Sequence, residues 1–566
     1  MEGIKLLEIK NILAVKSKSM ANVYASTLQQ NSSFPKTKRD SRSSGLTAYT
    51  GPWTSNEVSH LLRRTMFGAT KADIDYFLTK TVSQSVDELL TASAVAPIGP
   101  LNNYNDGTYT DPNVILGAEW GNAPYDNNAN SKRRKSFKSW WTGLMLNQGR
   151  SIEEKMTLFW HNHFAIESAT IGDARFAYKN NALLRQYALG NFKTLTKQVT
   201  IDPGMLKYLN GYLNTKNAPD ENYGRELQEL FTVGKDPVQQ YTQNDVVMAA
   251  KVLTGYRVDA VNNVYYFNSQ KHDTNNKQFS SFYNNTVITG QSGAAGENEL
   301  DDLLNMIFAK DEVAEFICKK IYRFFVYYAI DATIDTNVIQ PLAAIFRANN
   351  YEIAPVLLAL FKSEHFFDAL NFGCVIKNPV DYFVGACREF GAVFPPSTDI
   401  VLQYFFYYAL QAEMALTNMD IGDPPNVAGW PAYYQSPAYH ETWINSDSLP
   451  KRTSFADLLV GVGYTHQGFT LKFDVLAFTA ALPNPSDPNA VINDALAILY
   501  AIDTDVNLFN YLKTILLSGQ ATDSYWTDAW LDYAGTPSNQ TYAGIVKTRL
   551  TQMYQYLLDL AEYQLS

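Results

Sequence analysis

Apolar residues recur at helical spacing through most of this sequence, and no other feature constrains its fold as strongly. After a cap at Thr54–Glu57, Leu61 and Leu62 lie at the intervals of one helix face. Segments of helical length and pattern are then predicted at 151–164, 174–188, 192–201, 220–233, 242–254, 297–309, 311–328, 337–348, 352–361, 378–391, 401–416, 491–501 and 541–562. After Gly255 the spacing changes to the alternation of strands, which predicts a β-hairpin over 256–267.

We therefore expect a mostly α protein, built as a large multi-helix orthogonal bundle with a small β-hairpin insertion near 256–267 and a helical C-terminal cap. A chain of 566 residues is long for one core, and its composition divides it into three parts. Residues 1–50 include a stretch rich in Ser, Lys and Arg, which predicts a flexible N-terminal arm. The main helical domain is expected over 51–452, and a C-terminal helical extension packed on it over 453–566.

Charge and hydropathy exclude several classes of partner. The net charge of −10 indicates no nucleic-acid partner, and no apolar run reaches transmembrane length. The longest apolar run near the start, Ile12–Val15 between Lys10 and Lys16, is too short for the core of a signal peptide. The sequence alone therefore predicts a cytoplasmic location, and export would need a route other than a cleaved signal.

The stretch from Asp220 to Gly255 places polar residues beside an apolar stripe. On a regular helix Asn222, Glu226 and Glu229 lie at i, i+4 and i+7, which is one face. This arrangement predicts a cleft lined by two carboxylates that could serve as acid and base. Arg225 is a candidate contact for an anionic group, and the alternative is a surface ion pair between Arg225 and Glu229.

Two more polar positions follow in the sequence. Asp245 is a candidate catalytic carboxylate, but Thr242 three residues earlier predicts that Asp245 instead caps the helix. His272, Asp273 and Lys277 lie in a polar loop after the hairpin. We expect this loop to be exposed, either contacting an anion or substrate or simply solvated.

Histidines and carboxylates provide a candidate metal set. His161, His163 and Glu226 would suit a divalent ion such as zinc, manganese or iron. Residues two apart on a helix point roughly 200° apart, so the two histidines cannot both reach one ion from a regular helix. Either the helix ends near Trp160 or only one histidine faces the cleft. The alternative for each is an imidazole that packs against aromatic rings and bonds a backbone carbonyl.

Seven phrases resemble a known bacterial family. They are Leu61–Thr70, Lys155–Phe164, Asn222–Leu227, Tyr241–Val246, Leu253–Tyr256, His272-Asp273 with Lys277, and Asn426–Pro431. In this order, over about residues 55–455, they resemble the family catalogued as domain of unknown function 1800 (DUF1800). The resemblance implies no reaction. It does imply export, because members often carry export signals, and a protein partner of a sulfatase-like family, because the genes often lie side by side.

Two functions are compatible with these patterns. The first is a metal-assisted or acid–base enzyme, a hydrolase acting on a polymer or glycan. Its catalytic residues would be Glu226, Glu229, Asp245 and His272, its substrate contacts Asn222, Arg225, Asp273, Lys277 and Trp430, and its metal ligands His161, His163 and Glu226. The alternative is a non-catalytic surface or scaffold protein, in which a cleft rich in Tyr (the chain has 36) binds a glycan or a protein partner. An enzyme requires these polar side chains to converge, whereas a scaffold leaves them scattered and satisfied locally.

Overall fold

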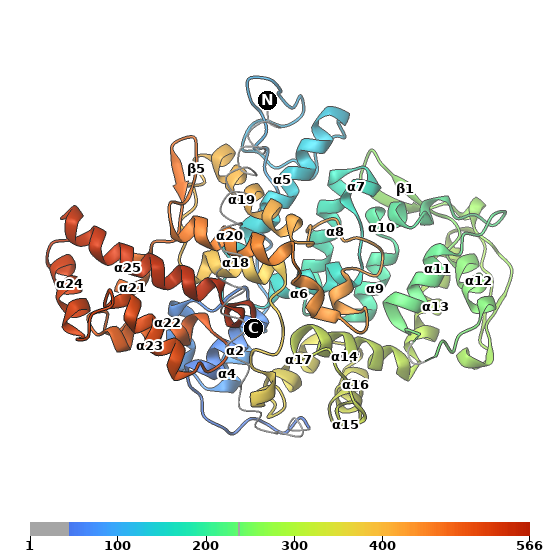
Figure 1. The fold of residues 1–566 in the computed structure, drawn as a ribbon. Coiled ribbons are helices and arrows are strands. Elements are labelled where there is room, and N and C mark those ends of the chain that lie inside the picture. Colours follow the sequence, from blue (N-terminus) through green and yellow to red (C-terminus); the bar gives the residue numbers. More distant parts are fainter. Residues whose placement is uncertain (1–44, 236–237) are drawn as a thin grey trace.

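The computed structural model describes residues 45–235 and 238–566, and the predicted arm lies almost entirely outside this part. The described chain is mostly helical, as predicted, and its strands form only two-stranded antiparallel sheets. Figure 1 shows the helices crossing at large angles around a central group, with the C-terminal helices gathered at one end.

The main body contains helices at many orientations. They are α2 (Ser55–Thr65), α3 (Lys71–Leu78), α4 (Val82–Leu89), α5 (Asn127–Leu146), α6 (Glu153–His163), α7 (Ser168–Ile171), α8 (Ala174–Gln186), α9 (Phe192–Thr200), α10 (Pro203–Tyr208), α11 (Asn222–Glu226), α12 (Gln243–Val252), α13 (Glu299–Phe308), α14 (Asp311–Phe325), α15 (Ala332–Ile334), α16 (Gln340–Ala348), α17 (Ile353–Phe361), α18 (Pro379–Glu389) and α19 (Ile400–Leu416). Two wide π-helical turns, η2 (Leu227–Thr232) and η6 (Asp335–Ile339), continue α11 and α15. Two 3₁₀ turns, η8 (Pro431–Tyr433) and η9 (Tyr439–Trp443), follow α19.

Aromatic side chains fill the centre of the main body, where α5 packs against α8 and α19 and where α6 packs against α8. Trp141 and Trp160 are fully buried. Each indole N–H has a partner: Trp141 donates to Glu154 Oε2 at 3.1 Å, and Trp160 donates to the carbonyl of Ala188 at 3.1 Å. Burial of large rings whose polar atoms remain bonded makes this region the rigid centre of the fold.

Two glycines allow the chain leaving α2 to touch the backbone of α18. Gly68 has a φ of +77°, and a Cβ at this position would lie 2.9 Å from both Cα and the carbonyl oxygen of Gly385. Any larger residue would therefore force the two segments apart. The close approach places the chain just after α2 against the middle of α18.

The hairpin predicted over 256–267 is present. β1 (Tyr256–Asp259) pairs antiparallel with β2 (Val264–Phe267), with Tyr256 opposite Phe267. Two further pairs were not predicted: β3 (Lys277–Gln278) with β4 (Val287–Ile288), and β5 (Tyr464–His466) with β6 (Phe469–Leu471). These strands are only two or three residues long, too short to leave an alternating pattern in the sequence.

The chain after residue 447 forms α20 (Ser448–Val460), α21 (Val475–Ala480), α22 (Pro488–Leu499), α23 (Val506–Leu516), α24 (Ser524–Gly535) and α25 (Gln540–Asp559). α25 packs against α20, α21, α23 and α24, and α22 packs against α2 of the main body. The predicted domain boundary at 452/453 falls inside α20. Among residues 45–235 and 238–566, no helix combines the length and apolar character needed to cross a bilayer.

Candidate functional site

The polar stretch after Asp220 is not the regular helix that its spacing indicated. α11 ends at Glu226, and the π-helical turn η2 follows. Wide turns of this kind are rare, and they often occur at functional sites. The i, i+4, i+7 relation among Asn222, Glu226 and Glu229 therefore does not define one face here.

The polar side chains of α11 and η2 have separate surroundings. Arg225 pairs with Glu221 at 3.2 Å, not with Glu229. Glu229 pairs instead with Lys235, and Asn222 is exposed. Glu226 is half-buried, and burial followed by the charge of Glu229 raises the pKa of Glu226. Of the polar residues predicted to share this face, only Glu226 and Glu229 interact electrostatically with each other.

Asp245 has the structural role that Thr242 indicated. Its Oδ2 accepts hydrogen bonds from Thr242 N at 2.7 Å and from Thr242 Oγ1 at 2.9 Å. Ser280 donates two more, from N and from Oγ, each at 2.7 Å. With four hydrogen bonds and no exposed surface, Asp245 ties α12 to the loop after β3.

The expectation that His272, Asp273 and Lys277 form an exposed loop is wrong. All three are buried, and Glu299 of α13 is the partner of His272 and Lys277. Glu299 Oε1 lies 3.0 Å from His272 Nε2, and Glu299 Oε2 lies 2.5 Å from Lys277 Nζ. Asp273 accepts hydrogen bonds from the backbone and side chain of Asn275. The group is an internal ion pair that fixes the loop to α13.

His161 and His163 diverge, as helix geometry required, although α6 continues through His163 and does not end near Trp160. His161 Nε2 accepts a hydrogen bond from the backbone N–H of Gly422 at 3.2 Å, and burial lowers the pKa of His161 to about 4. Trp430, a predicted substrate contact, is buried beside His161, with 5.7 Å between their ring centroids.

His163 is enclosed on the other side of α6. Its Nε2 lies 3.1 Å from the carbonyl oxygen of Phe231, and Lys320 Nζ lies 3.1 Å from its Nδ1. Lys320 also donates to the carbonyl of Leu230 at 3.2 Å. Burial lowers the pKa of His163 well below its usual value, so the imidazole is neutral. His163 and Lys320 thus bond carbonyls that the π-helical turn η2 presents.

The predicted metal set is not assembled. His161 and His163 have their nitrogens engaged on opposite sides of α6, and Glu226 belongs to α11. Within the part of the chain that the structure describes, no three His, Cys, Asp or Glu side chains are grouped to hold an ion. Most of the predicted site residues instead bond locally and connect loops to helices.

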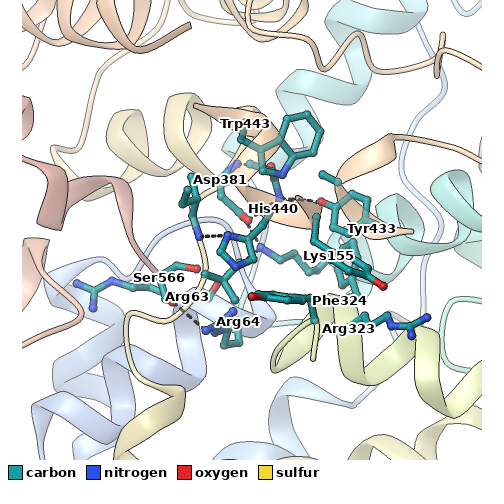
Figure 2. Close-up of a pocket in the computed structure, with 16 residues that line it drawn as sticks. Arg63, Arg64, Lys155, Arg323, Phe324, Asp381, Tyr433, His440, Trp443 and Ser566 are labelled. Atoms are coloured by element: carbon teal, nitrogen blue, oxygen red, sulfur yellow. Dashed lines mark hydrogen bonds and ion pairs between the residues drawn. The ribbon is translucent and has the colours of Figure 1, made fainter. Parts of the chain in front are cut away.

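A different group of charged residues converges on a cavity of about 30 Å³. We call it the cationic pocket, and Figure 2 shows it. It is lined by Arg63, Arg64, Lys155, Arg323, Phe324, Tyr328, Val375, Ile376, Asn378, Asp381, Ala432, Tyr433, Tyr439, His440, Trp443 and Ser566.

Six separate parts of the chain build this pocket, one of them Ser566. α2 contributes the two adjacent arginines, α6 contributes Lys155 and α14 contributes Arg323. Asp381 comes from the first turn of α18, next to the crossing at Gly68. The turns η8 and η9 form the remaining wall, to which Asn378 is joined by a 3.1 Å hydrogen bond to Tyr433 Oη.

Positive charge is in excess around the cavity. Among the lining side chains, Arg63, Arg64, Lys155 and Arg323 carry positive charge and Asp381 alone carries negative charge. The main-chain oxygen of Ser566 accepts a hydrogen bond from Arg64 at 2.8 Å. Even if this oxygen is counted as a full negative charge, the positive charges around the cavity outnumber the negative ones.

Lys155 and Asp381 form the one ion pair in the wall of the cavity. Lys155 Nζ donates to Asp381 Oδ1 and to the carbonyl of Met66, and burial lowers the pKa of Lys155. Asp381 Oδ2 also accepts from Asn378 Nδ2 at 2.6 Å. Both carboxylate oxygens of Asp381 thus have partners other than the arginines of the lining, so Asp381 does not neutralise those arginines.

Several buried nitrogen donors around the cavity lack a hydrogen-bond partner among the described residues. They are Nε of Arg63, Arg64 and Arg323, and Nε2 of His440. His440 Nδ1 accepts from the backbone N–H of Ile376 at 3.3 Å, which places the ring proton on Nε2. Burial, and then the charge of Arg64, lowers the pKa of His440 to about 4, so it is a neutral donor at pH 7.

The backbone beside His440 is held in an unfavourable conformation. Tyr439 has a φ of +40°, a left-handed value that bulky residues rarely adopt. Its ring stacks on Tyr328 with centroids 4.9 Å apart, and the guanidinium of Arg323 lies 5.7 Å from the same ring. Strain of this kind persists where surrounding contacts impose it, and it is concentrated at binding and catalytic sites.

We did not predict this pocket from the sequence, although part of the signal was available. Arg63 and Arg64 stand within the apolar pattern of 58–67, and Lys155 directly precedes Met156 and the apolar run Leu158–Trp160. Charged residues at positions predicted to be buried need a partner, which is a reason to examine them. Asp381 and His440 carry no comparable local signal.

Comparison with known proteins identifies the chain by family alone. The family model described as protein of unknown function (DUF1800) matches residues 60–565. The match continues about 110 residues beyond 455, the end of the span over which the sequence phrases resemble the family. No curated protein and no solved structure matches the chain.

Proposed function

The chain belongs to the DUF1800 family, and we propose that it binds an anionic ligand in the cationic pocket. The observation that supports this most strongly is the group of buried donors without partners beside four cations and one carboxylate. Burying charge without compensation is costly, and an anion in the cavity would remove that cost.

Neighbouring residues extend the positive region. Lys377 and Arg452 are buried beside Asp381, and burial lowers their pKa to about 8 and about 10. Glu389 is one further carboxylate near this region, and it accepts a hydrogen bond from Tyr563 Oη at 2.9 Å. An anion bound in the cavity would stabilise the charged forms of these residues.

The size of the cavity defines which part of a ligand enters. A volume of about 30 Å³ holds a small acidic group and not a whole sugar or peptide residue. Several residues of the lining, among them Arg323, Tyr328 and Tyr439, are half-buried, so part of the wall reaches the surface. The ligand in this proposal is therefore an acidic group on a larger molecule, such as an anionic polymer or glycan.

Titration calorimetry with inorganic phosphate, sulfate and acetate tests the proposal. We expect the wild-type protein to bind at least one of these ions, and Arg64→Gln and Arg323→Gln to bind it about tenfold more weakly or worse, because each removes a charge-assisted contact. Arg347→Gln is the matched control: Arg347 pairs with Asp311 on α14, and it does not line the pocket. Absence of binding for all three ions, or equal loss in the control, would refute the proposal.

An acid–base enzyme is the second candidate, supported by the coupling of Glu226 and Glu229. Tyr241 Oη is buried without a partner among the described residues, and burial, followed by the charges of Glu229 and Glu226, raises the pKa of Tyr241. A raised carboxyl pKa next to a second carboxylate is typical of acid–base pairs. Glu226→Gln would abolish turnover of a polymer substrate and leave anion binding in the cationic pocket unchanged. Unchanged turnover would eliminate this candidate.

A further inference from the structure

We propose that the acidic group bound by the cationic pocket is a phosphate monoester in its doubly charged form. This inference rests on the proposed function and names the ligand class of the same site. It separates the phosphate ester from the two other common acidic groups, the sulfate ester and the carboxylate, each of which carries one negative charge.

Arg64 cannot bind a carboxylate by two parallel hydrogen bonds. Nη2 of Arg64 already donates to the carbonyls of Asn371 at 3.1 Å and Ser566 at 2.8 Å. A guanidinium binds a planar carboxylate with two adjacent N–H groups, either those of Nε and Nη2 or those of Nη1 and Nη2. Because Nη2 of Arg64 already has two partners, neither pair is available. Nε of Arg64 remains as a single donor.

Arg63 is restricted in the same way. Its Nη1 donates to the carbonyl of Tyr500 at 2.7 Å and its Nη2 to that of Ile498 at 2.6 Å. Figure 2 shows its guanidinium directed away from the centre of the cavity. Arg63 therefore contributes positive charge to the site more than direct contact.

The remaining donors come from three separate elements. Arg64 approaches from α2, Arg323 from α14 and His440 from η9, whereas Lys155 Nζ is already engaged by Asp381 and by the carbonyls of Met66 and Arg63. Single donors from several directions match the oxygens of a tetrahedral group better than the two coplanar oxygens of a carboxylate. This selects a phosphate or sulfate ester.

Charge separates these two esters. The cavity lining has four cations and one carboxylate, and Asp381 is engaged by Lys155. A sulfate ester supplies one negative charge, whereas a phosphate monoester supplies up to two near pH 7 because its second pKa is about 6. The second charge interacts with the same excess of cations, which favours the phosphate ester.

Methyl phosphate and methyl sulfate form the matched pair for the test, since they have nearly the same shape and differ by one charge. By titration calorimetry at pH 7.5, we expect methyl phosphate to bind about tenfold more tightly than methyl sulfate or acetate. At pH 5 methyl phosphate carries one charge, so its advantage over methyl sulfate should fall to less than about threefold. Arg323→Gln should weaken methyl phosphate binding, and Arg347→Gln should not.

The protein groups facing the site do not produce this pH effect. His440, with a pKa of about 4, is largely neutral at both pH values. A guanidinium group is not deprotonated in this pH range. Lys377 behind the wall, with a pKa of about 8, gains charge at pH 5, which would strengthen binding of both esters.

Each outcome bears on a different claim. Tighter binding of methyl phosphate at pH 7.5 that disappears at pH 5 supports the inference. Equal binding of the two esters, or tighter binding of acetate, overturns it and leaves the proposed anion site intact. No binding of any of the three overturns both.

Discussion

At the scale of single residues, most of the polar side chains that stand out in the sequence maintain the fold. Asp245 caps α12, His161 receives the N–H of Gly422, and His163 with Lys320 bonds the carbonyls of η2. None of these side chains is free to meet a ligand. A polar residue in a recognisable phrase can thus be required for packing as much as for chemistry.

His161 allows this structural role to be measured. The unfolded chain takes up a proton on this residue below its ordinary pKa of about 6.5, whereas the folded protein does so only near pH 4. The contribution of His161 to stability is therefore lost as pH falls from 6.5 towards 4, by up to about 3 kcal/mol. In urea denaturation, His161→Gln should be less stable than wild type at pH 7, and the difference should shrink at pH 4.5. A difference that stays constant with pH would contradict this assignment.

Sequence reasoning was sound at this scale where only local geometry mattered. The 100° turn of a helix correctly separated His161 from His163, and the Thr242 spacing correctly indicated a cap. It failed for Lys277, because the partner that buries it, Glu299, lies 22 residues later in the sequence. A local sequence pattern does not predict a contact between residues so far apart.

At the scale of elements, short loops are fixed by buried polar groups more than by regular strands. The segment between β2 and α13 contains only the two-residue strands β3 and β4. Glu299, His272 and Lys277 connect its two ends, with all three side chains fully buried. We infer that this ion group, and not the sheet, determines the conformation of the segment.

Removing one partner of the buried group should therefore be severe. Glu299→Gln leaves Lys277 charged and uncompensated, and we expect a loss of about 3–5 kcal/mol in the free energy of unfolding by urea denaturation. The double change Glu299→Gln with Lys277→Met should recover part of the loss. Asp75→Asn, which breaks the exposed pair with Lys71, is the control and should cost less than about 1 kcal/mol. Similar losses for Glu299→Gln and Asp75→Asn would show that burial of the pair is unimportant.

Elements long enough to show a period were predictable, and irregular ones were not. The helices and the hairpin β1–β2 follow from apolar spacing. The π-helical turn η2 does not, because its carbonyls are bonded by His163 and Lys320 from other helices. The candidate cleft inferred from 3.6-residue spacing was lost for this reason.

At the scale of the whole molecule, α2 joins the main body to the C-terminal helices. Arg63 donates to the carbonyls at the end of α22, and Arg64 reaches both Asn371 and Ser566. The cationic pocket is lined by residues from 63 to 566, so the complete fold is needed to form it. This span explains why no local sequence pattern predicted the pocket.

The attachment of the C-terminal helices can be tested through Arg63. In Arg63→Gln the carbonyls of Ile498 and Tyr500 lose their donors, and we expect faster amide hydrogen exchange in α22 and α23 than in wild type. Exchange in the central helices α5 and α19 should change little. Lys71→Gln, on the neighbouring α3, removes an exposed ion pair and serves as the control. Uniformly faster exchange throughout the chain would indicate general destabilisation and not a local attachment.

A crystal structure of the protein grown with phosphate is the most direct test of the cationic pocket as an anion site. We expect a tetrahedral ion in the cavity, within hydrogen-bond distance of His440 Nε2 and Arg64 Nε, two of the donors that lack partners among the described residues. Phosphate ions found only on the outer surface, with water alone between Arg64 and His440, would contradict the account.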